Sequence, residues 1–420
     1  MRILDEIPVN WKKSKIKFIA QFSPEITHDV DYNEDIGYAP MNSIKNGYME
    51  PLSANFSSLK SGLTPFQDGD IVLAKVTPCF ENGNIAIAEG LSQHIGYGSS
   101  ELFVLRNKNI DRRFLFYFLQ NENFKHSCEA TMIGTGGLKR INPYFFQNAK
   151  IIYPSQEKQK EIVLFLDDKC DKIKEIIARI QSQISTLEEY KKSVITKAVT
   201  KGLNPDVQMK DSGVRWCPKI PSHWNVYNPK ALFTMRDQRA KTGERQLTAS
   251  QKHGIVYQDE FMEMESQRVV VVVKDFSILK HVEPGDFVIS MRSFQGGLEY
   301  STKRGCISSA YVMLIPNKEK VYPPFYRWFF KSSKYINALQ STTNLIRDGQ
   351  AMRYKNFAMI SLFDIPLEEQ KEIADYLDEK CKKIDHLIVL KKEQFLSLDS
   401  YKKSLIFAYV TGKKEVPSHE

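Results

Sequence analysis

One glycine-rich stretch, GDFVISMRSFQGGLEYS at residues 285–301, combines side chains that can bond nucleic-acid bases. The guanidinium of Arg292 can bond both acceptors of a guanine edge, and the amide of Gln295 suits an adenine edge. Ser293 can bond a base or a phosphate, and the two glycines that follow would let the backbone come close. The alternative interpretation is an ordinary turn between strands. We predict that Arg292, Ser293 and Gln295 contact a nucleic acid.

Further polar loops extend this candidate set over the whole chain. In the second half the candidates are Arg347, Gln350 and Arg353 around Gly349, and then Ser250, Gln251 and Lys252. In the first half they are Lys75, Thr77 and Asn82, then Lys139 and Arg140, and then Ser43 and Lys45. All of them carry amide, hydroxyl or cationic groups that can bond phosphates or base edges. Each loop could equally be a solvated turn.

The distribution of charge supports a polyanionic partner for one region only. Residues 214–366 carry 22 basic and 13 acidic side chains, whereas residues 1–156 carry 16 of each. The net charge of +9 for the whole chain therefore comes from the later region. A basic surface attracts nucleic acid, although a soluble protein with an uneven surface would show the same imbalance.

Two short strings are similar to parts of an adenine methyltransferase, and both are incomplete. NPYF at 142–145 lacks the second proline of the loop that holds a flipped adenine, and a turn before a helix explains it equally well. IGTGG at 133–137 lacks the third glycine and the following acidic residue of a cofactor loop. The sequence also has no GxxxxGK[ST] motif and no HExxH or CxxC spacing. We therefore expect no catalytic residues, no bound cofactor and no metal in this chain.

The composition is that of a soluble protein. Of the 420 residues, 42% are hydrophobic and 26% are charged. The longest aliphatic run, residues 269–273, is far short of the roughly 20 residues that span a bilayer. The N-terminal residues show no signal-peptide pattern, and the six cysteines suggest no disulfide framework. We expect a cytoplasmic protein.

A long internal repeat must position these loops. Residues 159–200 and 370–411 are identical at 20 of 42 aligned positions, with an offset of 211. In both copies apolar residues recur at alternating steps of three and four, which predicts a helix of about 66 Å with a heptad stripe. Proline precedes each copy, and Gly202 and Gly412 follow them, as expected at helix ends.

The regions between the helices match only weakly. GDIV at 69–72 corresponds to GDFV at 285–288, and each region has one aromatic helix, at 112–120 and 323–331. The predicted fold is therefore α+β, with two diverged globular heads that alternate with two long helices. Each helix needs an apolar partner, so we expect the two to pair as an antiparallel coiled coil in a pseudo-twofold internal duplication.

This order of parts resembles the DNA-specificity subunit of type I restriction–modification systems. The strings that carry the resemblance are GDIVLAKVTPCFENGN (69–84), GSSELFVLR (98–106), GCISSAYVML (305–314), ITKAVTKGLNP (195–205) and QKEI at the start of both repeats. The resemblance implies target-recognition domains at 1–156 and 223–366, conserved coiled-coil helices at 157–202 and 367–412, an inter-repeat linker at 203–222 and a tail at 413–420.

The resemblance also implies a function without catalysis. Each head would read one half of a bipartite, asymmetric double-stranded DNA site, and the helices would set the spacing and dock two modification subunits. Those subunits would bind S-adenosylmethionine and methylate adenine, and restriction subunits would join the complex. Two alternatives remain open at this point: a stand-alone DNA methyltransferase, and a coiled-coil scaffold for protein interactions.

Overall fold

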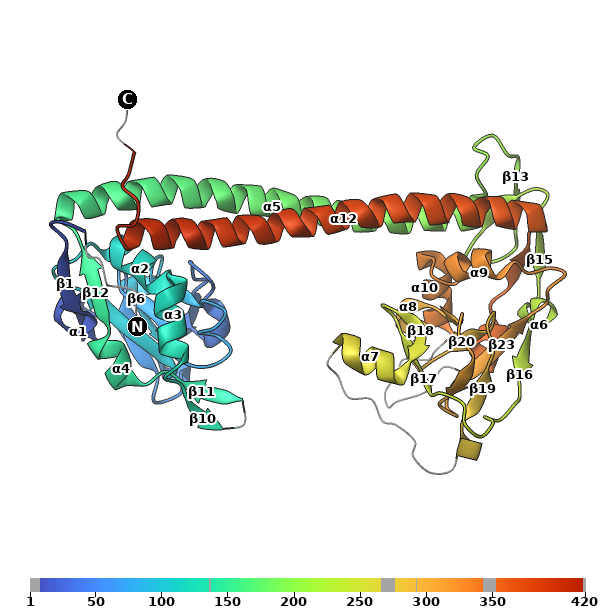
Figure 1. Cartoon of the computed structure of the whole chain (residues 1–420), viewed down its shortest axis with the longest axis horizontal. Helices are drawn as coiled ribbons and strands as arrows, with labels where there is room; N and C mark the ends of the chain where they lie inside the picture. The colour runs from blue at the N-terminus through green and yellow to red at the C-terminus, as the bar shows by residue number, and fades with distance from the viewer. Residues whose placement is uncertain (1–7, 136, 266–275, 292, 343–352, 418–420) are drawn as a thin grey trace. The chain divides into compact units, whose positions relative to one another are not determined.

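The computed structural model describes residues 8–135, 137–265, 276–291, 293–342 and 353–417. The chain divides into two compact units, each with its own hydrophobic core (Figure 1). Unit 1 is Met1–Gln181 with Glu393–Glu420, and unit 2 is Ser182–Lys392. Each unit therefore contains one head and a part of each long helix.

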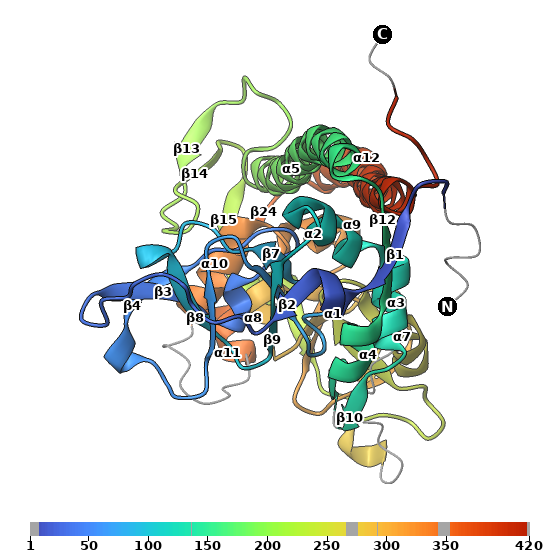
Figure 2. The ribbon, with the colours of Figure 1, turned by 90° about the vertical axis from the view of Figure 1, so that its left-hand side faces the viewer.

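Two four-stranded sheets form most of the head of unit 1. Their orders are β2-β9-β6-β7 and β4-β3-β8-β5 (Figure 2). The other strands form two antiparallel pairs, β1-β12, which joins the two ends of the head sequence, and the hairpin β10-β11. The strands are β1 Lys12–Lys15, β2 Ala20–Phe22, β3 Asp35–Ala39, β4 Leu52–Asn55, β5 Thr64–Gln67, β6 Ile71–Ala74, β7 Ile85–Ile87, β8 Ile95–Gly98, β9 Leu102–Asn107, β10 Ile133–Thr135, β11 Leu138–Arg140 and β12 Lys150–Tyr153. The helices are α1 Ile16–Ile19, α2 Arg112–Gln120, α3 Glu122–Glu129 and α4 Pro143–Asn148.

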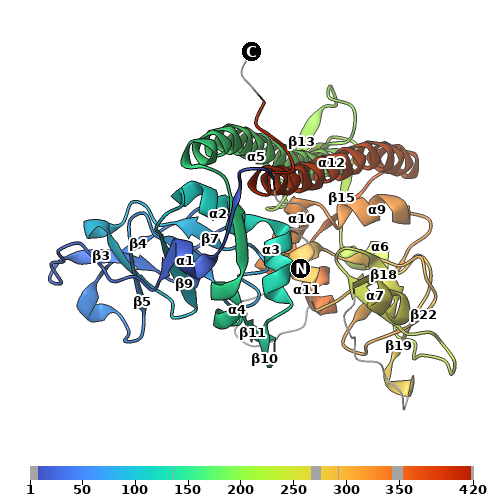
Figure 3. The ribbon, with the colours of Figure 1, turned by 60° about the vertical axis from the view of Figure 1, so that its left-hand side comes forward.

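The head of unit 2 repeats part of this plan. Its four-stranded sheet has the order β16-β23-β20-β21, and the remaining strands pair as β13-β14, β15-β24, β17-β18 and β19-β22. The strands are β13 Met209–Asp211, β14 Lys219–Pro221, β15 Asn225–Tyr227, β16 Phe233–Arg236, β17 Leu247–Ser250, β18 Gly254–Tyr257, β19 Lys280–Val282, β20 Phe287–Ile289, β21 Glu299–Tyr300, β22 Gly305–Ile307, β23 Val312–Pro316 and β24 Leu362–Asp364. The helices are α6 Pro229–Leu232, α7 Gln258–Glu265, α8 Ser293–Gly296, α9 Pro323–Phe329, α10 Ser333–Ser341 and α11 Tyr354–Ala358, and α7 lies beside β18 (Figure 3).

The two long helices are α5, Gln156–Lys201, and α12, Leu367–Val410. In unit 1 the first part of α5, with Leu166 and Cys170, shares a core with Leu405 and Tyr409 near the end of α12. In unit 2 the last part of α5 shares a core with the first part of α12. The pairing is therefore antiparallel, and the predicted α+β fold with two long paired helices is confirmed.

Glycine ends both long helices in the same way. Gly202 and Gly412 have φ angles of +72° and +69°, which a residue with a side chain rarely adopts. A Cβ on Gly412 would lie 3.0 Å from the ring of Trp11, and one on Gly202 would lie 3.7 Å from the ring of Trp224. Trp11 and Trp224 therefore pack against the ends of the two long helices.

The segment between the repeats, interpreted from sequence as an inter-repeat linker at 203–222, is an ordered part of unit 2. It contains the β13–β14 pair, and its Cys217 and Ile220 are fully buried in the core of that unit. The indole N–H of Trp216, in the same turn, donates to the carbonyl oxygen of Ser361 at 3.2 Å. Proline and glycine in this segment therefore mark a packed hairpin.

The aromatic helices form where the sequence predicts them, at α2 and α9. Asp111 caps α2 by accepting from the amide of Phe114 at 3.0 Å, and Phe114 and Phe118 are buried. The NPYF string is also a helix start, because Asn142 accepts from the amide of Phe145 at 3.2 Å at the beginning of α4. Within the described residues, no helix is both long and apolar enough to cross a membrane.

Candidate nucleic-acid interface

In unit 1 the loop after β6 and the β10–β11 hairpin come together through Thr77. The Thr77 hydroxyl donates to the carbonyl oxygen of Gly137 at 2.7 Å and accepts from the amide of Lys139 at 2.9 Å. The Thr77 amide donates to the carbonyl oxygen of Lys139 at 2.9 Å. Two loops that are 60 residues apart in sequence thus form one surface, at the end of the head away from α5 and α12 (Figures 1 and 3).

Three of the predicted cationic side chains belong to this surface. Lys139 and Arg140 are exposed on β11, and the Lys75 amine lies 5.7 Å from the centre of the Phe103 ring. Arg140 makes a two-pronged ion pair with Glu101, with Nη2–Oε1 and Nε–Oε2 distances of 2.7 and 2.9 Å. The Arg140 guanidinium holds the pKa of Glu101 below its usual range. Arg140 is thereby oriented but partly neutralised, and Lys75 and Lys139 provide the remaining positive charge.

The other unit 1 candidates are Ser43, Lys45 and Asn82. Ser43 is 6% exposed and sits in a 3₁₀ turn, so its side chain is buried in this structure and its contact with DNA stays a prediction. The neighbours of Lys45 and Asn82, which are Asn46 and Gly83, line a cavity of about 30 Å³ against α12. Lys45 and Asn82 are thus next in the chain to residues of this cavity, and the Asn82 amide donates to the carbonyl oxygen of Pro78, beside Thr77.

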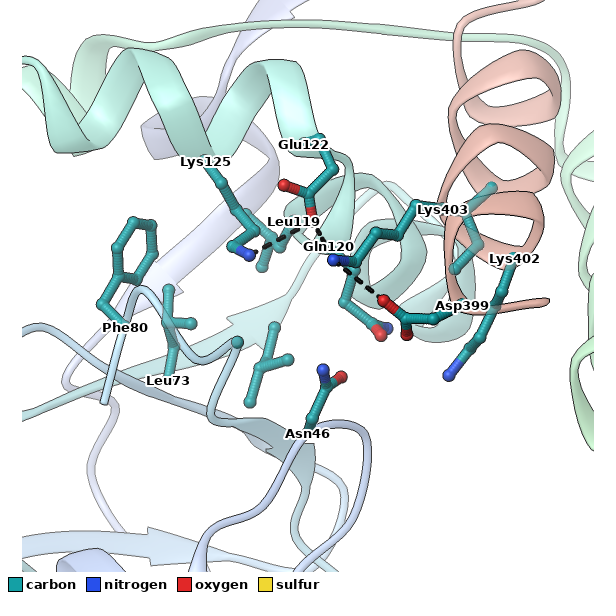
Figure 4. Close-up of a pocket in the computed structure, with 13 residues that line it drawn as sticks. Asn46, Leu73, Phe80, Leu119, Gln120, Glu122, Lys125, Asp399, Lys402 and Lys403 are labelled. Atoms are coloured by element: carbon teal, nitrogen blue, oxygen red, sulfur yellow. Dashed lines mark hydrogen bonds and ion pairs between the residues drawn. The ribbon is translucent and has the colours of Figure 1, made fainter. Parts of the chain in front are cut away.

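Residues that line this cavity form an ionic network (Figure 4). Glu122 lies 3.2 Å from the Lys125 amine and 3.7 Å from the Lys403 amine, and Asp399 lies 3.1 Å from Lys403. Lys402 also lines the cavity, and among the described residues it has no hydrogen bond or ion pair. Burial lowers the pKa of Lys402. The network fixes the head of unit 1 on α12.

In unit 2 the turn after β17 lies against α8. A Cβ on Gly296 of α8 would lie 2.9 Å from the Gln251 side chain, so two of the predicted loops come together here. Lys252 and His253 both contact Oε1 of Glu265, at 2.6 and 2.7 Å. These two side chains hold the pKa of Glu265 below its usual range, with His253 the larger cause. Lys252 is therefore an ion-paired side chain in this structure.

The glycine-rich loop after β20 divides into buried and exposed positions. Ser293 is 1% exposed, and its hydroxyl accepts from the amide of Ser290 at 2.8 Å. The hydroxyl therefore closes a buried turn in this structure, and its contact with DNA stays a prediction. Gln295 is exposed on α8, and Ser250 is partly buried where its hydroxyl accepts from the amide of His253 at 3.2 Å.

The remaining predicted residues fall near α11. Arg353 is exposed, immediately before α11, and its amide donates to the Asn356 side chain at 3.2 Å. Arg292, Arg347 and Gln350 lie outside the described residues. In chain order, residues 343–352 stand between α10 and α11, as the β10–β11 hairpin stands between α3 and α4.

Similarity to known proteins points in one direction. A model of the type I restriction modification DNA specificity domain matches residues 8–186. The EcoAI specificity subunit of a type I restriction enzyme from Escherichia coli is 32% identical over 238 residues, which cover 54% of this chain and 38% of that protein. The putative type I restriction enzyme MjaX specificity subunit from Methanocaldococcus jannaschii is 25% identical over 430 residues, which cover 98% of this chain and 96% of that protein.

The chain is similar to type I restriction–modification specificity subunits over almost its whole length. A chain from a solved structure described as the structural basis of complex assembly and conformational transition of the type I R-M system shares the fold. Its TM-score is 0.71 at 15% identity, over 97% of this chain and 100% of that chain. The matched part spans only 38% and 33% of the length of the two Escherichia coli relatives, the EcoAI and EcoEI specificity subunits.

Sequence reasoning missed several residues that shape the candidate interface. Glu101 and Glu265 hold the predicted cations from distant positions, and no sequence pattern connects them to Arg140 and Lys252. From sequence, residues 133–137 were interpreted as an incomplete cofactor loop and Lys139 and Arg140 as candidate DNA contacts, but the β10–β11 hairpin that joins them was not predicted. Its strand residues on either side of a glycine-rich turn are, however, a hairpin signal that could have been recognised. Among the described residues, no three His, Cys, Asp or Glu side chains form a group that could hold a metal ion.

Proposed function

We propose that this chain recognises a double-stranded DNA sequence and directs adenine methylation and restriction by partner subunits, without a catalytic site of its own. The observation that carries the proposal is the Thr77 surface, where two separate polar loops form one exposed, cationic end of the head. A site that reads bases requires such convergence, because one loop reaches only a few base edges. The match of residues 8–186 to the DNA specificity domain and the similarity to specificity subunits support the same function.

The two heads would read the two halves of an asymmetric site. Both heads have a four-stranded sheet of the same topology, with orders β2-β9-β6-β7 and β16-β23-β20-β21. Their surface loops differ, because unit 1 has a hairpin tied to Thr77 and unit 2 has the α8 loop against Gln251. A chain with two unlike readers on repeated helices can recognise two different half-sites, which a symmetric homodimer cannot.

Two modification subunits would dock on the repeated helices. Ile176 and Leu387 are matched by the repeat and are 44% and 46% exposed, and Tyr190 and Tyr401 are matched and 48% and 56% exposed. Large apolar side chains that stay exposed at matched positions are suited to two copies of one partner. These partners would bind S-adenosylmethionine, and restriction subunits would join the complex in the cytoplasm. The continuous helices α5 and α12 would set the spacing between half-sites.

The function is tested by mapping methylated adenines in a host that carries this chain with its modification subunits. We expect one bipartite motif, which changes in one half only when residues 223–366 are exchanged for the head of another specificity subunit. The purified chain alone, incubated with S-adenosylmethionine and DNA, should transfer no methyl groups. Methyl transfer by the isolated chain, or a head exchange that altered both halves, would overturn the proposal.

A further inference from the structure

The β10–β11 hairpin of unit 1 has an exposed apolar face. Ile133 is 70% exposed and Leu138 is 52% exposed. The strand register places Ile133 opposite Arg140 and Thr135 opposite Leu138, so these four side chains project from the same face of the hairpin. Exposed branched aliphatic side chains on a narrow two-stranded ribbon are costly in water and suited to a binding surface.

The hairpin is held in a fixed conformation. A Cβ on Gly134 would lie 2.1 Å from the carbonyl oxygen of Leu138, and φ at Gly134 is +154°, so this position requires glycine. Thr77 anchors the turn at Gly137 and Lys139, and Val76 forms a backbone bridge with Arg140. A rigid ribbon loses little conformational entropy when it binds, which favours its use in recognition.

Charge and dimensions favour DNA as the occupant of this face. The major groove of B-DNA admits a two-stranded β-ribbon. Lys139 projects from the opposite face of the ribbon and is exposed, and Lys75 stands at its base, so cations flank the aliphatic side chains. The one apolar group on the base edges of the major groove is the 5-methyl group of thymine.

We propose that Ile133 and Leu138 read thymine in the half-site of unit 1 by packing on its 5-methyl group. This inference rests on the proposed function and makes it more specific. Lys139 and Lys75 hold the neighbouring phosphates, and Thr77 is a positioning residue that fixes the turn. Discrimination against cytosine at the same position then comes from an apolar contact, with no hydrogen bond from the hairpin required.

The test replaces thymine by uracil, which lacks only the methyl group. The chain is purified with its modification subunits, and its affinity for the mapped site is measured with uracil at each thymine position of either half-site in turn. We expect about fourfold weaker binding at one or two positions of the unit 1 half-site, the change that burial of one methyl-sized group gives. Uracil in the other half-site should change the affinity of the hairpin variants by the same factor as that of the unmodified chain.

Variants assign the effect to the hairpin. Leu138→Ala or Ile133→Ala should bind thymine DNA about four- to tenfold more weakly, and uracil at the contacted position should cause no further loss. Leu52→Ala is the matched control, because Leu52 is 54% exposed on β4 of the same head. It should retain the full thymine–uracil difference. The thermal stability of all three variants should match that of the unmodified chain.

The possible results separate the inference from the proposed function. Sequence-specific binding that is unchanged by uracil at every thymine, or a unit 1 half-site without thymine, would overturn the inference alone. Hairpin variants that bind DNA normally but no longer retain the modification subunits would overturn it in favour of a protein-docking face. Binding without any sequence preference would overturn the proposed function itself.

Discussion

Gln159 of α5 and Gln370 of α12 are 211 residues apart and hold the same place in the two units. Each is buried, and each accepts a hydrogen bond from the backbone amide of the residue before an aromatic helix. Gln159 accepts from Asp111 at 2.7 Å, and Gln370 accepts from Tyr322 at 2.8 Å. Their own amide groups donate to nearby carbonyl oxygens. The repeated helices thus attach to both heads through the same side chain.

Substitution of either glutamine should loosen the head on its own side. Gln159→Ala leaves the amide of Asp111 buried without an acceptor, which should cost about 1–3 kcal/mol. Hydrogen exchange measured by mass spectrometry should show faster exchange at the start of α2 but not of α9, and Gln370→Ala should give the reverse. Gln183→Ala, at an exposed position of α5, is the control. Equal exchange in both heads after a single substitution would contradict the local role.

A buried ion pair stabilises the central sheet of each head. Arg236 donates to both oxygens of Asp286 at 2.7 and 2.8 Å, and the pair is almost completely buried. Asp286→Ala leaves the guanidinium without its partner, so we expect unit 2 to lose about 3–5 kcal/mol. Glu161→Ala removes an exposed partner of Lys158 and should cost less than about 1 kcal/mol. Urea unfolding of both variants provides the measurement, and similar losses would show that burial does not decide the effect.

The same ion pair shows which features the sequence predicts and which it does not. The matched strings GDIV and GDFV identify Asp70 and Asp286 as equivalent, and in both heads the aspartate directly precedes a central strand. Their arginine partners are not equivalent, because Arg106 is on β9 and Arg236 is on β16. Heptad spacing predicts the long helices and their partner, since apolar burial is periodic along a helix. A side chain that pairs with a residue on another strand has no fixed spacing in the sequence, so only the structure identifies it.

The candidate site was predictable in type but not in detail. Glycine and polar residues marked the loop after β6 and the segment of the β10–β11 hairpin, since turns have a strong local signature. Whether a serine in such a turn faces solvent is decided by tertiary packing, and Ser43 and Ser293 face inward. Glu265, the last residue of α7, pairs with Lys252 in the turn after β17, and no local sequence pattern specifies this pair.

The Glu265 ion pair predicts how the turn after β17 takes part in DNA binding. Glu265→Gln removes the carboxylate, so Lys252 becomes free to bind a phosphate. The plot of log affinity against log salt should then become steeper by about 0.9, the value for one more phosphate contact in B-DNA. Lys252→Gln should abolish this gain in the double variant. An unchanged salt dependence would mean that the turn lies outside the interface.

The same carboxylate predicts a change with pH. Because the pKa of Glu265 is held below its usual value, the ion pair is fully formed above the ordinary glutamate pKa of 4.5. It is lost as the pH falls through the lower pKa of the folded protein. The Glu265→Gln variant should therefore approach the unmodified chain in acid, and thermal unfolding at pH 7 and pH 4 compares the two.

Matched apolar side chains predict the number of partners. Ile176→Glu should disrupt one docking surface and Leu387→Glu the other, because a charge in an apolar interface is not compensated. Each single variant should hold one modification subunit and the double variant none, as measured by light scattering after size exclusion. Ser185→Glu, also exposed on α5, should hold two. Loss of both subunits after one substitution would contradict two independent docking surfaces.

The last prediction concerns two lysines at equivalent positions of the repeat whose surroundings differ in the structure. Lys191 in unit 2 contacts both carboxylate oxygens of Asp385 at 2.7 Å. Lys402 is the equivalent residue in unit 1, and Lys174 occupies the position equivalent to Asp385. Duplication has therefore left a paired ammonium in one unit and an unpaired, partly buried one in the other.

Methionine at these two positions should have opposite effects. Lys402→Met removes an ammonium whose burial has no compensating ion pair, so unit 1 should gain about 1 kcal/mol at pH 7. Lys191→Met leaves Asp385 without its partner and should cost about 0.5 kcal/mol. Methionine has a similar length and fills the same space, so packing changes little in either variant. Thermal unfolding at pH 7 measures both differences.

The pH dependence of the stability gain tests whether the charge of Lys402 causes it. Burial lowers its pKa and Lys174 lowers it further, while Cys170, Asp399 and Asp171 act in the opposite direction. The folded protein therefore holds this proton less tightly than the unfolded chain, and the charged lysine is destabilising below the pKa of the folded state. As the pH rises toward the ordinary value of 10.5, the lysine loses its proton and the advantage of Lys402→Met should disappear. A gain that persisted unchanged at pH 10 would show that the methionine acts through packing instead of charge.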